Sequence, residues 1–186
     1  MAERTQPPPS ITFRPLATDD LPLLHRWLNN PRVYRWYGGE APSFAEVAEQ
    51  YAPRTLAASA IHPYLILHQT APIGYIQSYM IADDPEYAAL VGDSRGAAAL
   101  DVLIGEDTSA LRGLGAASVR AFLDTVIFAA SDTTRCFIDP HPDNLIAMRA
   151  YTRAGFRPLR RLDPAPPAEP CLLMRIERTD LERLER

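Results

Sequence analysis

The chain has 186 residues, 47% hydrophobic and 23% charged, with a formal net charge of −4 and an isoelectric point near 5.6. These values are typical of one soluble domain with a substantial core, and they argue against general nucleic-acid binding, which needs a basic surface. No apolar run reaches membrane-spanning length, and the N-terminus lacks the apolar core of a signal peptide. We therefore expect a cytoplasmic protein with neither a nucleic-acid nor a membrane partner.

The residues that commonly bind metals show no ligand spacing. The two cysteines, Cys136 and Cys171, lie in apolar, strand-like runs, which favours buried, reduced thiols over a disulfide. The four histidines are scattered along the chain. We expect no metal site.

The first half of the chain alternates between strand and helix patterns. Residues 1–10 contain three consecutive prolines and predict a disordered leader, so one domain is expected over residues 11–186. A strand at 11–16 is followed by a helix with an apolar stripe, which Asp19 and Asp20 can cap. An aromatic loop at 33–40 and a second helix from Ser43 follow. Residues 64–68 and 73–81 then predict a hairpin.

The second half predicts a loop at 82–97 and a strand at 98–105. A Gly-rich turn then leads into a helix that reaches Ala130. A strand at 134–138, a helix that ends at Gly155, two closing strands at 156–162 and 171–177, and a short final helix complete the order. This order predicts a mixed α/β sheet flanked by helices.

The Gly-rich turn "LRGLG" at 111–115 lies between a strand and a long helix. Gly113 and Gly115 allow backbone N–H groups to approach an anion closely, and the helix N-terminus favours negative charge. Arg112 can add an ion pair to a phosphate. A tight turn without a ligand is an equally good interpretation of the two glycines alone.

Asp101 stands out because it lies in the apolar strand "AAALDVLIG". A carboxylate among apolar neighbours is costly unless it is paired, hydrogen-bonded or facing a wet cleft. The alternative interpretation is a solvated carboxylate on the outer face of the strand.

These features, followed by "DNLIAMRAYTRAGF" at 143–156, resemble the GNAT acetyltransferase superfamily. The resemblance implies a mixed, mostly antiparallel twisted sheet with about four flanking helices, and acetyl-CoA as the acetyl donor with its pyrophosphate on the Gly-rich turn. The turn departs from the family pattern at Ala110, where a basic or amide residue is usual.

The resemblance also implies roles for individual residues. Asn144 contacts the cofactor arm, Tyr151 lies by the thioester sulfur and donates a proton to the leaving thiolate, and the strand backbone near Leu103 binds the developing oxyanion. The full implied cofactor-binding set is Val102, Leu103, Ile104, Arg112, Gly113, Leu114, Gly115, Ala116, Asn144 and Ala147.

A narrower resemblance covers most of the chain. The stretches at 23–40, 72–80 and 139–156, together with the strand aspartate Asp101, are similar to aminoglycoside 6'-N-acetyltransferases. The resemblance implies that Asp101 is the general base or orients the amine, and that Asp139 lies in the sugar pocket. The other implied substrate contacts are Trp36, Tyr37, Gln77, Tyr79 and a loop carboxylate, taken as Asp83 with Asp84 and Glu86 as alternatives.

A pocket with several carboxylates suits a polycationic acceptor. The resemblance therefore predicts acetyl-CoA-dependent N-acetylation of the 6'-amine of aminoglycosides by direct transfer in a ternary complex, hence antibiotic resistance, by a monomer or weak homodimer. Two alternatives stay open. Siderophore-pathway acyltransferases for small amines resemble the same stretches, and Ala110 favours a non-catalytic acyl-CoA-binding module.

Overall fold

The computed structural model describes residues 11–37, 40–92, 94–106, 113–130, 132–162 and 169–184. The expected leader at 1–10, and also Ala110 and Arg112, lie outside these residues. None of the helices in the described part of the chain has the length and apolarity needed to cross a bilayer.

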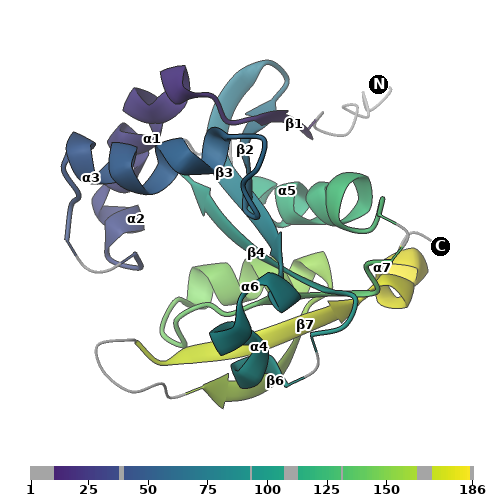
Figure 1. The fold of residues 1–186 in the computed structure, drawn as a ribbon. Coiled ribbons are helices and arrows are strands. Elements are labelled where there is room, and N and C mark those ends of the chain that lie inside the picture. The colour runs from purple at the N-terminus through teal and green to yellow at the C-terminus, as the bar shows by residue number, and fades with distance from the viewer. Residues whose placement is uncertain are drawn as a thin grey trace, which may run out of the picture.

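Seven strands form one twisted sheet in the order β1-β2-β3-β4-β5-β7-β6 (Figure 1). Among these strands only β4 and β5 pair in parallel, so the expected mostly antiparallel sheet is confirmed. The strands are β1 (Ile11–Pro15), β2 (His62–His68), β3 (Ala71–Met80), β4 (Ala97–Ile104), β5 (Arg135–Ile138), β6 (Arg157–Leu162) and β7 (Cys171–Glu177).

Helices cover both faces of the sheet (Figure 1). One face carries α1 (Leu21–Leu28), α2 (Pro31–Tyr34) and α3 (Phe44–Tyr51) at one end of the strands, and α4 (Pro85–Val91) at the other. The opposite face carries α5 (Leu114–Phe122), α6 (Leu145–Ala154) and α7 (Arg178–Leu184).

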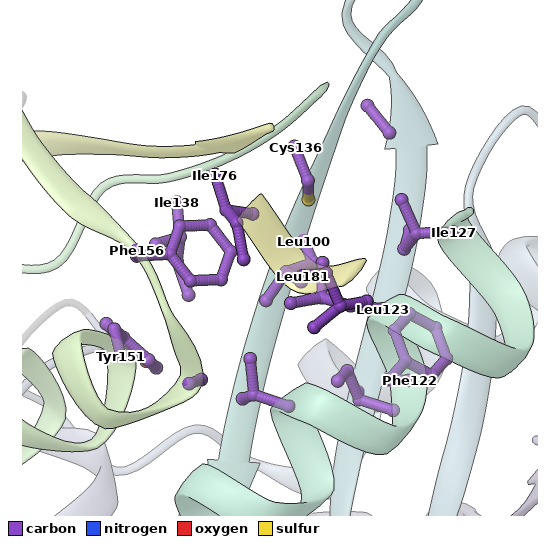
Figure 2. Packing of buried hydrophobic residues seen from close by; sticks show 14 of the residues in the cluster. Leu100, Phe122, Leu123, Ile127, Cys136, Ile138, Tyr151, Phe156, Ile176 and Leu181 are labelled. Atoms are coloured by element: carbon purple, nitrogen blue, oxygen red, sulfur yellow. The ribbon is translucent and has the colours of Figure 1, made fainter. Parts of the chain in front are cut away.

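The alternation of β4 side chains divides the core. Leu100 points into the large cluster under α5 and α6, where Figure 2 shows it with Phe122, Phe156 and Tyr151. On the other face, Leu103 joins the cluster under α1 to α3, and Ala99 joins the cluster under α4. Asp101 lies between these last two on the same face, so it occupies the boundary between two apolar clusters.

The sheet splits between β4 and β5. β3 pairs with β4 along its whole length as far as Ile104, whereas β5 pairs with β4 only as far as Ala99. The remainder of β4 therefore has a hydrogen-bonding partner strand on one side only. This divergence opens a gap in the middle of the sheet.

Two short helices were missed by the sequence analysis. α2 starts at Pro31 and runs into the aromatic loop predicted at 33–40, and α4 lies within the region 82–97 that was expected to be a loop. Both begin with the same signal, a capping side chain followed by proline: Asn30 accepts from the Arg32 N–H, and Asp84 accepts from the Tyr87 N–H. The expectation of about four helices was therefore too low; the described residues contain seven α-helices.

The start of α1 also differs in detail from the expectation. Thr18–Asp20 form a short 3-10 turn, and the Asp20 carboxylate does not cap α1. It instead accepts from the Ala17 N–H at 2.8 Å and pairs with the Arg14 guanidinium at 2.8 Å. Asp20 thus fastens the end of β1 to the first helix.

Helix α6 is capped at both ends, and the sequence predicted only its end at Gly155. The side-chain oxygen of Asn144 accepts from the Ala147 N–H at 3.2 Å, and Gly155 adopts a left-handed conformation with φ of 110°. The Phe156 N–H then bonds to the Tyr151 carbonyl, which returns the chain to the sheet at β6. These caps fix the position of Tyr151 in the helix between them.

Gly155→Ala is expected to destabilise the protein by about 2 kcal/mol, because the left-handed conformation strains a residue with a Cβ atom. That Cβ would also lie 2.8 Å from Leu184 Cδ1 and 2.9 Å from Ile176 Cδ1. Urea unfolding measures the change. Gly115→Ala is the matched control, since its Cβ meets only ordinary contacts at 3.8 Å and 3.9 Å. Equal stability of the two variants would contradict the argument.

Candidate active site

A pocket of about 140 Å³ lies where β4 and β5 diverge. It combines residues from the segment after α2, the end of β4, the end of β5 and α6. Its lining residues are Trp36, Tyr37, Asp101, Val102, Ile138, Asp139, Pro140, His141, Asn144 and Tyr151. Seven of the residues singled out in the sequence are therefore brought together: Trp36, Tyr37, Asp101, Val102, Asp139, Asn144 and Tyr151.

Asp101 is held from the neighbouring strand. The Gln77 side-chain amide donates to its Oδ2 at 2.6 Å, and the two residues are direct partners in the β3–β4 register. Burial raises the pKa of the Asp101 carboxyl, while the Gln77 hydrogen bond and the charge of Arg54 oppose that rise. Asp101 is thus desolvated and hydrogen-bonded, as the first of the two sequence interpretations requires.

Asp139 follows directly after β5 and carries the second pocket carboxyl. Burial raises its pKa to about 7, and the nearby charge of Asp101 adds to the rise. The nearby Tyr87 hydroxyl of α4 lowers the pKa of Asp139 and so opposes this rise. This hydroxyl is buried, and it forms no hydrogen bond of normal geometry with any described residue. Two carboxyls therefore face one desolvated site, and the charge of Asp101 disfavours ionisation of Asp139.

Tyr151 lies on α6, on the opposite face of the sheet from α1, α2 and α3. It is 8% exposed, and burial, followed by the charges of Asp101 and Asp139, raises its pKa well above the usual value. Its hydroxyl therefore stays protonated at any physiological pH. A protonated hydroxyl beside the strand gap can donate a proton or a hydrogen bond to a leaving group.

The aromatic residues after α2 form a wall of the pocket. Tyr37 as a whole residue is 41% exposed, but its hydroxyl points inward and donates to the Val102 carbonyl at 3.1 Å. Burial of that hydroxyl raises the pKa of Tyr37. The centres of the Trp36 and His141 rings are 5.6 Å apart, and the Arg35 guanidinium carbon lies 4.6 Å from the centre of the Trp36 ring.

The backbone of β4 shows which residues can bind an extended ligand in the gap. The Leu103 carbonyl oxygen faces Gly74 of β3, so the backbone groups of Leu103 belong to the β3 ladder. The Val102 carbonyl instead accepts from Tyr37 in the pocket. Because alternate residues of a strand pair with opposite sides, the Val102 and Ile104 N–H groups face the gap, rather than that of Leu103.

The start of α5 fits a phosphate-bearing group. Gly113 has a φ of 87° and precedes the helix that begins at Leu114. The first N–H groups of a helix have no intrahelical partners, and they bind anions favourably. Gly115 and Ala116 follow in the first turn, whereas Arg112 lies outside the described residues.

Three predicted substrate residues do not line the pocket. Gln77 is 6% exposed and lies behind Asp101. Tyr79 is on the same sheet face, 6.3 Å from the Tyr87 ring, and burial raises its pKa, as do Asp101 and Asp139. Asp83 is exposed in the short turn between β3 and α4.

Sequence reasoning missed several residues of this region. Arg54 follows the helix predicted from Ser43, Tyr87 lies in the predicted loop at 82–97, and His141 lies between the strand predicted at 134–138 and the next helix. His141 could have been found from its place in "DPHPDN" directly after Asp139, but nothing in the sequence pairs Arg54 with Gln77. Among the described residues, no group of three or more His, Cys, Asp or Glu side chains is arranged to hold a metal ion.

The raised pKa of Asp139 makes stability depend on pH. Because the folded protein holds this proton more tightly than the unfolded chain, the stabilising effect is present at low pH and is lost as pH rises from 3.8 to about 7. We expect the stability of the wild type relative to Asp139→Asn, measured by urea unfolding, to be greater at pH 5 than at pH 8. Asp143→Asn, at a carboxyl that is 86% exposed, is the control. A pH-independent difference for Asp139→Asn would refute the burial argument.

Comparison with known proteins places this geometry in a family. The model described as an acetyltransferase (GNAT) domain matches residues 17–164. The aminoglycoside N(6')-acetyltransferase type 1 of Serratia marcescens is 34% identical over 179 residues, which cover 95% of this chain and 88% of the relative. The protein of the same name from Klebsiella pneumoniae is 34% identical over 176 residues, 94% of this chain and 86% of the relative.

Solved structures of similar proteins have the same fold. The crystal structure of aminoglycoside acetyltransferase AAC(6')-Ib in complex with coenzyme A has a TM-score of 0.84 at 32% identity, and it covers 95% of this chain and 100% of its own. The complex of that enzyme with coenzyme A and kanamycin has a TM-score of 0.83 at 31% identity, with the same coverage. The fold as a whole therefore has its counterpart in solved aminoglycoside acetyltransferases, and the chain belongs to the GNAT family of acetyltransferases.

Proposed function

We propose that the chain transfers the acetyl group of acetyl-CoA directly to the 6'-amine of an aminoglycoside bound in the same pocket. The observation that carries the proposal is the meeting of Asp101, Asp139 and Tyr151 in one pocket at the split between β4 and β5. The relatives named above support the acceptor class, because their names state that they acetylate aminoglycosides at N6'.

Acetyl-CoA supplies an activated thioester, and the protein fits it with three elements. The N–H groups that begin α5 at Gly113–Ala116 would bind the pyrophosphate. The free side of β4 at Val102 and Ile104 would pair with the amide-bearing arm and bind the carbonyl oxygen. The Asn144 oxygen caps α6, which leaves its side-chain N–H groups for the arm, while Ala147 lies one turn further on the same helix.

The acceptor would lie on the face that carries both carboxyls. An aminoglycoside is a polycation, and its charged amines would offset the desolvation cost of the buried carboxylates. Asp139 and Asp101 would hold the reacting ring, with Trp36 and Tyr37 as an apolar wall against which a sugar can pack. Tyr79 lies near the end of β3 and Asp83 in the turn that follows, where other rings of the acceptor would reach them.

Transfer requires a neutral amine, so a proton must leave the acceptor. Burial makes Asp101 a stronger base than an exposed aspartate, and Gln77 holds it in one orientation. The Asp101 carboxylate would take the proton of the attacking ammonium directly or through one water. The amine would then attack the thioester carbonyl to form the C–N bond, and the C–S bond would break as the Tyr151 hydroxyl protonates the departing sulfur. The second proton of the acylated nitrogen would return to Tyr151 through water, and Asp101 would release its proton to solvent, so no covalent enzyme intermediate is needed.

This activity would neutralise a cationic drug group and thereby confer resistance to the antibiotic. The first test is thiol release from acetyl-CoA with kanamycin, tobramycin, a 6'-hydroxyl aminoglycoside and a hydroxylated lysine amine. We expect turnover with the first two and none with the 6'-hydroxyl compound, which has no amine at that position. Turnover on the lysine amine alone would overturn the aminoglycoside assignment in favour of a siderophore-type acceptor.

Asp101→Asn is expected to lower kcat by about 100-fold or more, the usual range for removal of a general base. Acetyl-CoA binding, measured by calorimetry, is expected to be unchanged because the donor contacts are backbone groups and α6. Asp124→Asn, an exposed carboxyl after α5 on the other face, is the control. Unchanged turnover in Asp101→Asn would remove this residue from the mechanism.

A further inference from the structure

Arg54 is a cation placed next to the acidic acceptor site. It belongs to the short 3-10 segment Ala52–Thr55 that continues α3, and its guanidinium lies 4.4 Å from the centre of the Tyr51 ring. One of its terminal nitrogens donates to the Gln77 side-chain oxygen at 2.7 Å. A positive charge is unexpected beside a pocket that is suited to a polycation, so its position requires an explanation.

The contacts of the Gln77 amide supply one. Its oxygen accepts from both Arg54, at 2.7 Å, and the Tyr75 hydroxyl, at 2.5 Å. With its oxygen held in this way, the amide has one orientation, in which its nitrogen donates to Asp101 at 2.6 Å. The four side chains form one connected chain of hydrogen bonds that ends at the pocket carboxylate.

Among these four side chains, Arg54 is the one that fixes which way the Gln77 amide points. A guanidinium can only donate, whereas a tyrosine hydroxyl can donate or accept. With Arg54 present, the amide oxygen must face it and the amide N–H₂ must face Asp101. Without Arg54, the Gln77 amide could rotate by half a turn, with Tyr75 accepting from its nitrogen, and its oxygen would then face Asp101. That orientation is compatible only with a protonated carboxyl.

We propose that Arg54 is a positioning residue that locks the Gln77 amide and so presents Asp101 to the acceptor as an oriented carboxylate. The inference deepens the proposed function and rests on it for its catalytic meaning. It also gives Gln77 a role as the link between Arg54 and Asp101 instead of a direct contact with the sugar. The charge of Arg54 additionally favours ionised Asp101 through space.

The groups that act on Asp101 come from every element around the pocket. Arg54 and Gln77 favour the carboxylate. The ionisable groups whose interactions involve Asp101 are Tyr37, Tyr51, Tyr75, Tyr79, Tyr87, Cys136, Asp139 and Tyr151. Burial raises the pKa of each, so the tyrosines and the thiol stay neutral at neutral pH. Asp139 is the one other group in this set that changes charge there.

A direct test reads the protonation of Asp101 in the protein without substrates. Protein labelled with ¹³C at the aspartate carboxyl is titrated by NMR, and Asp101→Asn identifies the signal. The midpoint of the Asp101 titration is expected to move to higher pH in Arg54→Met, because both supports of the carboxylate are weakened. Arg54→Lys keeps a donor and a charge and is expected to stay near the wild type. An unchanged midpoint in Arg54→Met would overturn the proposal.

The matched control is Arg178→Met. Arg178 also lies over an aromatic ring, that of Phe128 at 5.5 Å, and donates to the Thr133 carbonyl at 3.0 Å, but it does so near the start of α7. Its replacement is expected to affect stability without moving the Asp101 titration. An equal movement in Arg178→Met would show that general loosening, and not the Gln77 lock, causes the effect.

Kinetics with the best acceptor provide the second readout. In Arg54→Met we expect kcat to fall by about tenfold, the scale of one hydrogen bond to a charged group, while the KM for acetyl-CoA stays unchanged. The acid limb of the pH–rate profile should move to higher pH. In a Gln77→Leu background the same substitution should have a much smaller effect, because the link is already broken. An undiminished tenfold loss in that background would overturn the role of Gln77 as the link.

Failure of the proposed function and failure of this inference are distinguishable. Wild-type protein that releases no thiol with any acceptor would refute the proposed function, and the NMR titration would still decide the role of Arg54. Turnover by the wild type together with identical Asp101 titrations in wild type and Arg54→Met would refute the inference and leave the proposed function intact.

Discussion

The early end of the β4–β5 pairing is the constraint on which the site depends. Parallel strands that stay paired would satisfy every backbone group between them, and no ligand could enter the sheet. Here β5 stops pairing with β4 after Ala99, while β3 stays paired with β4 as far as Ile104. The strand is thus rigid on one side and open on the other. A rigid strand with unpaired backbone groups can bind a second chain-like molecule without reorganising.

The same divergence explains why two carboxyls can be tolerated inside the protein. Asp101 and Asp139 follow the last paired residues of their strands, so both point into the space that the split creates rather than into either apolar cluster. Each still carries a desolvation cost, which appears as a raised pKa. Their neighbours reduce this cost in different ways: Asp101 has a hydrogen bond from an amide, while Asp139 holds its proton to near neutral pH.

Much of this arrangement could be predicted from the residues. Tyr75, Gln77 and Tyr79 alternate within the strand predicted at 73–81, and the structure places them on one face of β3, because side-chain period is a local property of the backbone. Gly155 marked the end of α6 correctly for a similar reason, since capping depends on a few adjacent residues, whereas the cap that Asn144 forms at the start of this helix was not predicted. The pocket itself was predicted through resemblance to a family.

What the sequence could not supply depends on long-range contacts or on very short elements. α2 and α4 escaped detection because four and seven residues carry too little periodicity, although the Asn-Pro and Asp-Pro pairs at their starts were visible. Arg54 meets Gln77 only because α3 packs across β3, so no local pattern reveals it. The choice of Val102 over Leu103 for the open backbone groups required knowing which side of β4 faces β3.

The half-ionised state of Asp139 has a thermodynamic consequence for any cation that enters the pocket. A carboxyl with a pKa of about 7 is protonated in roughly half of the molecules at neutral pH, and a bound cation favours the ionised form. Binding therefore expels part of a proton into the medium. The heat of association includes the ionisation heat of whichever buffer receives that proton, so calorimetric enthalpies in phosphate and in Tris differ even where the affinities agree.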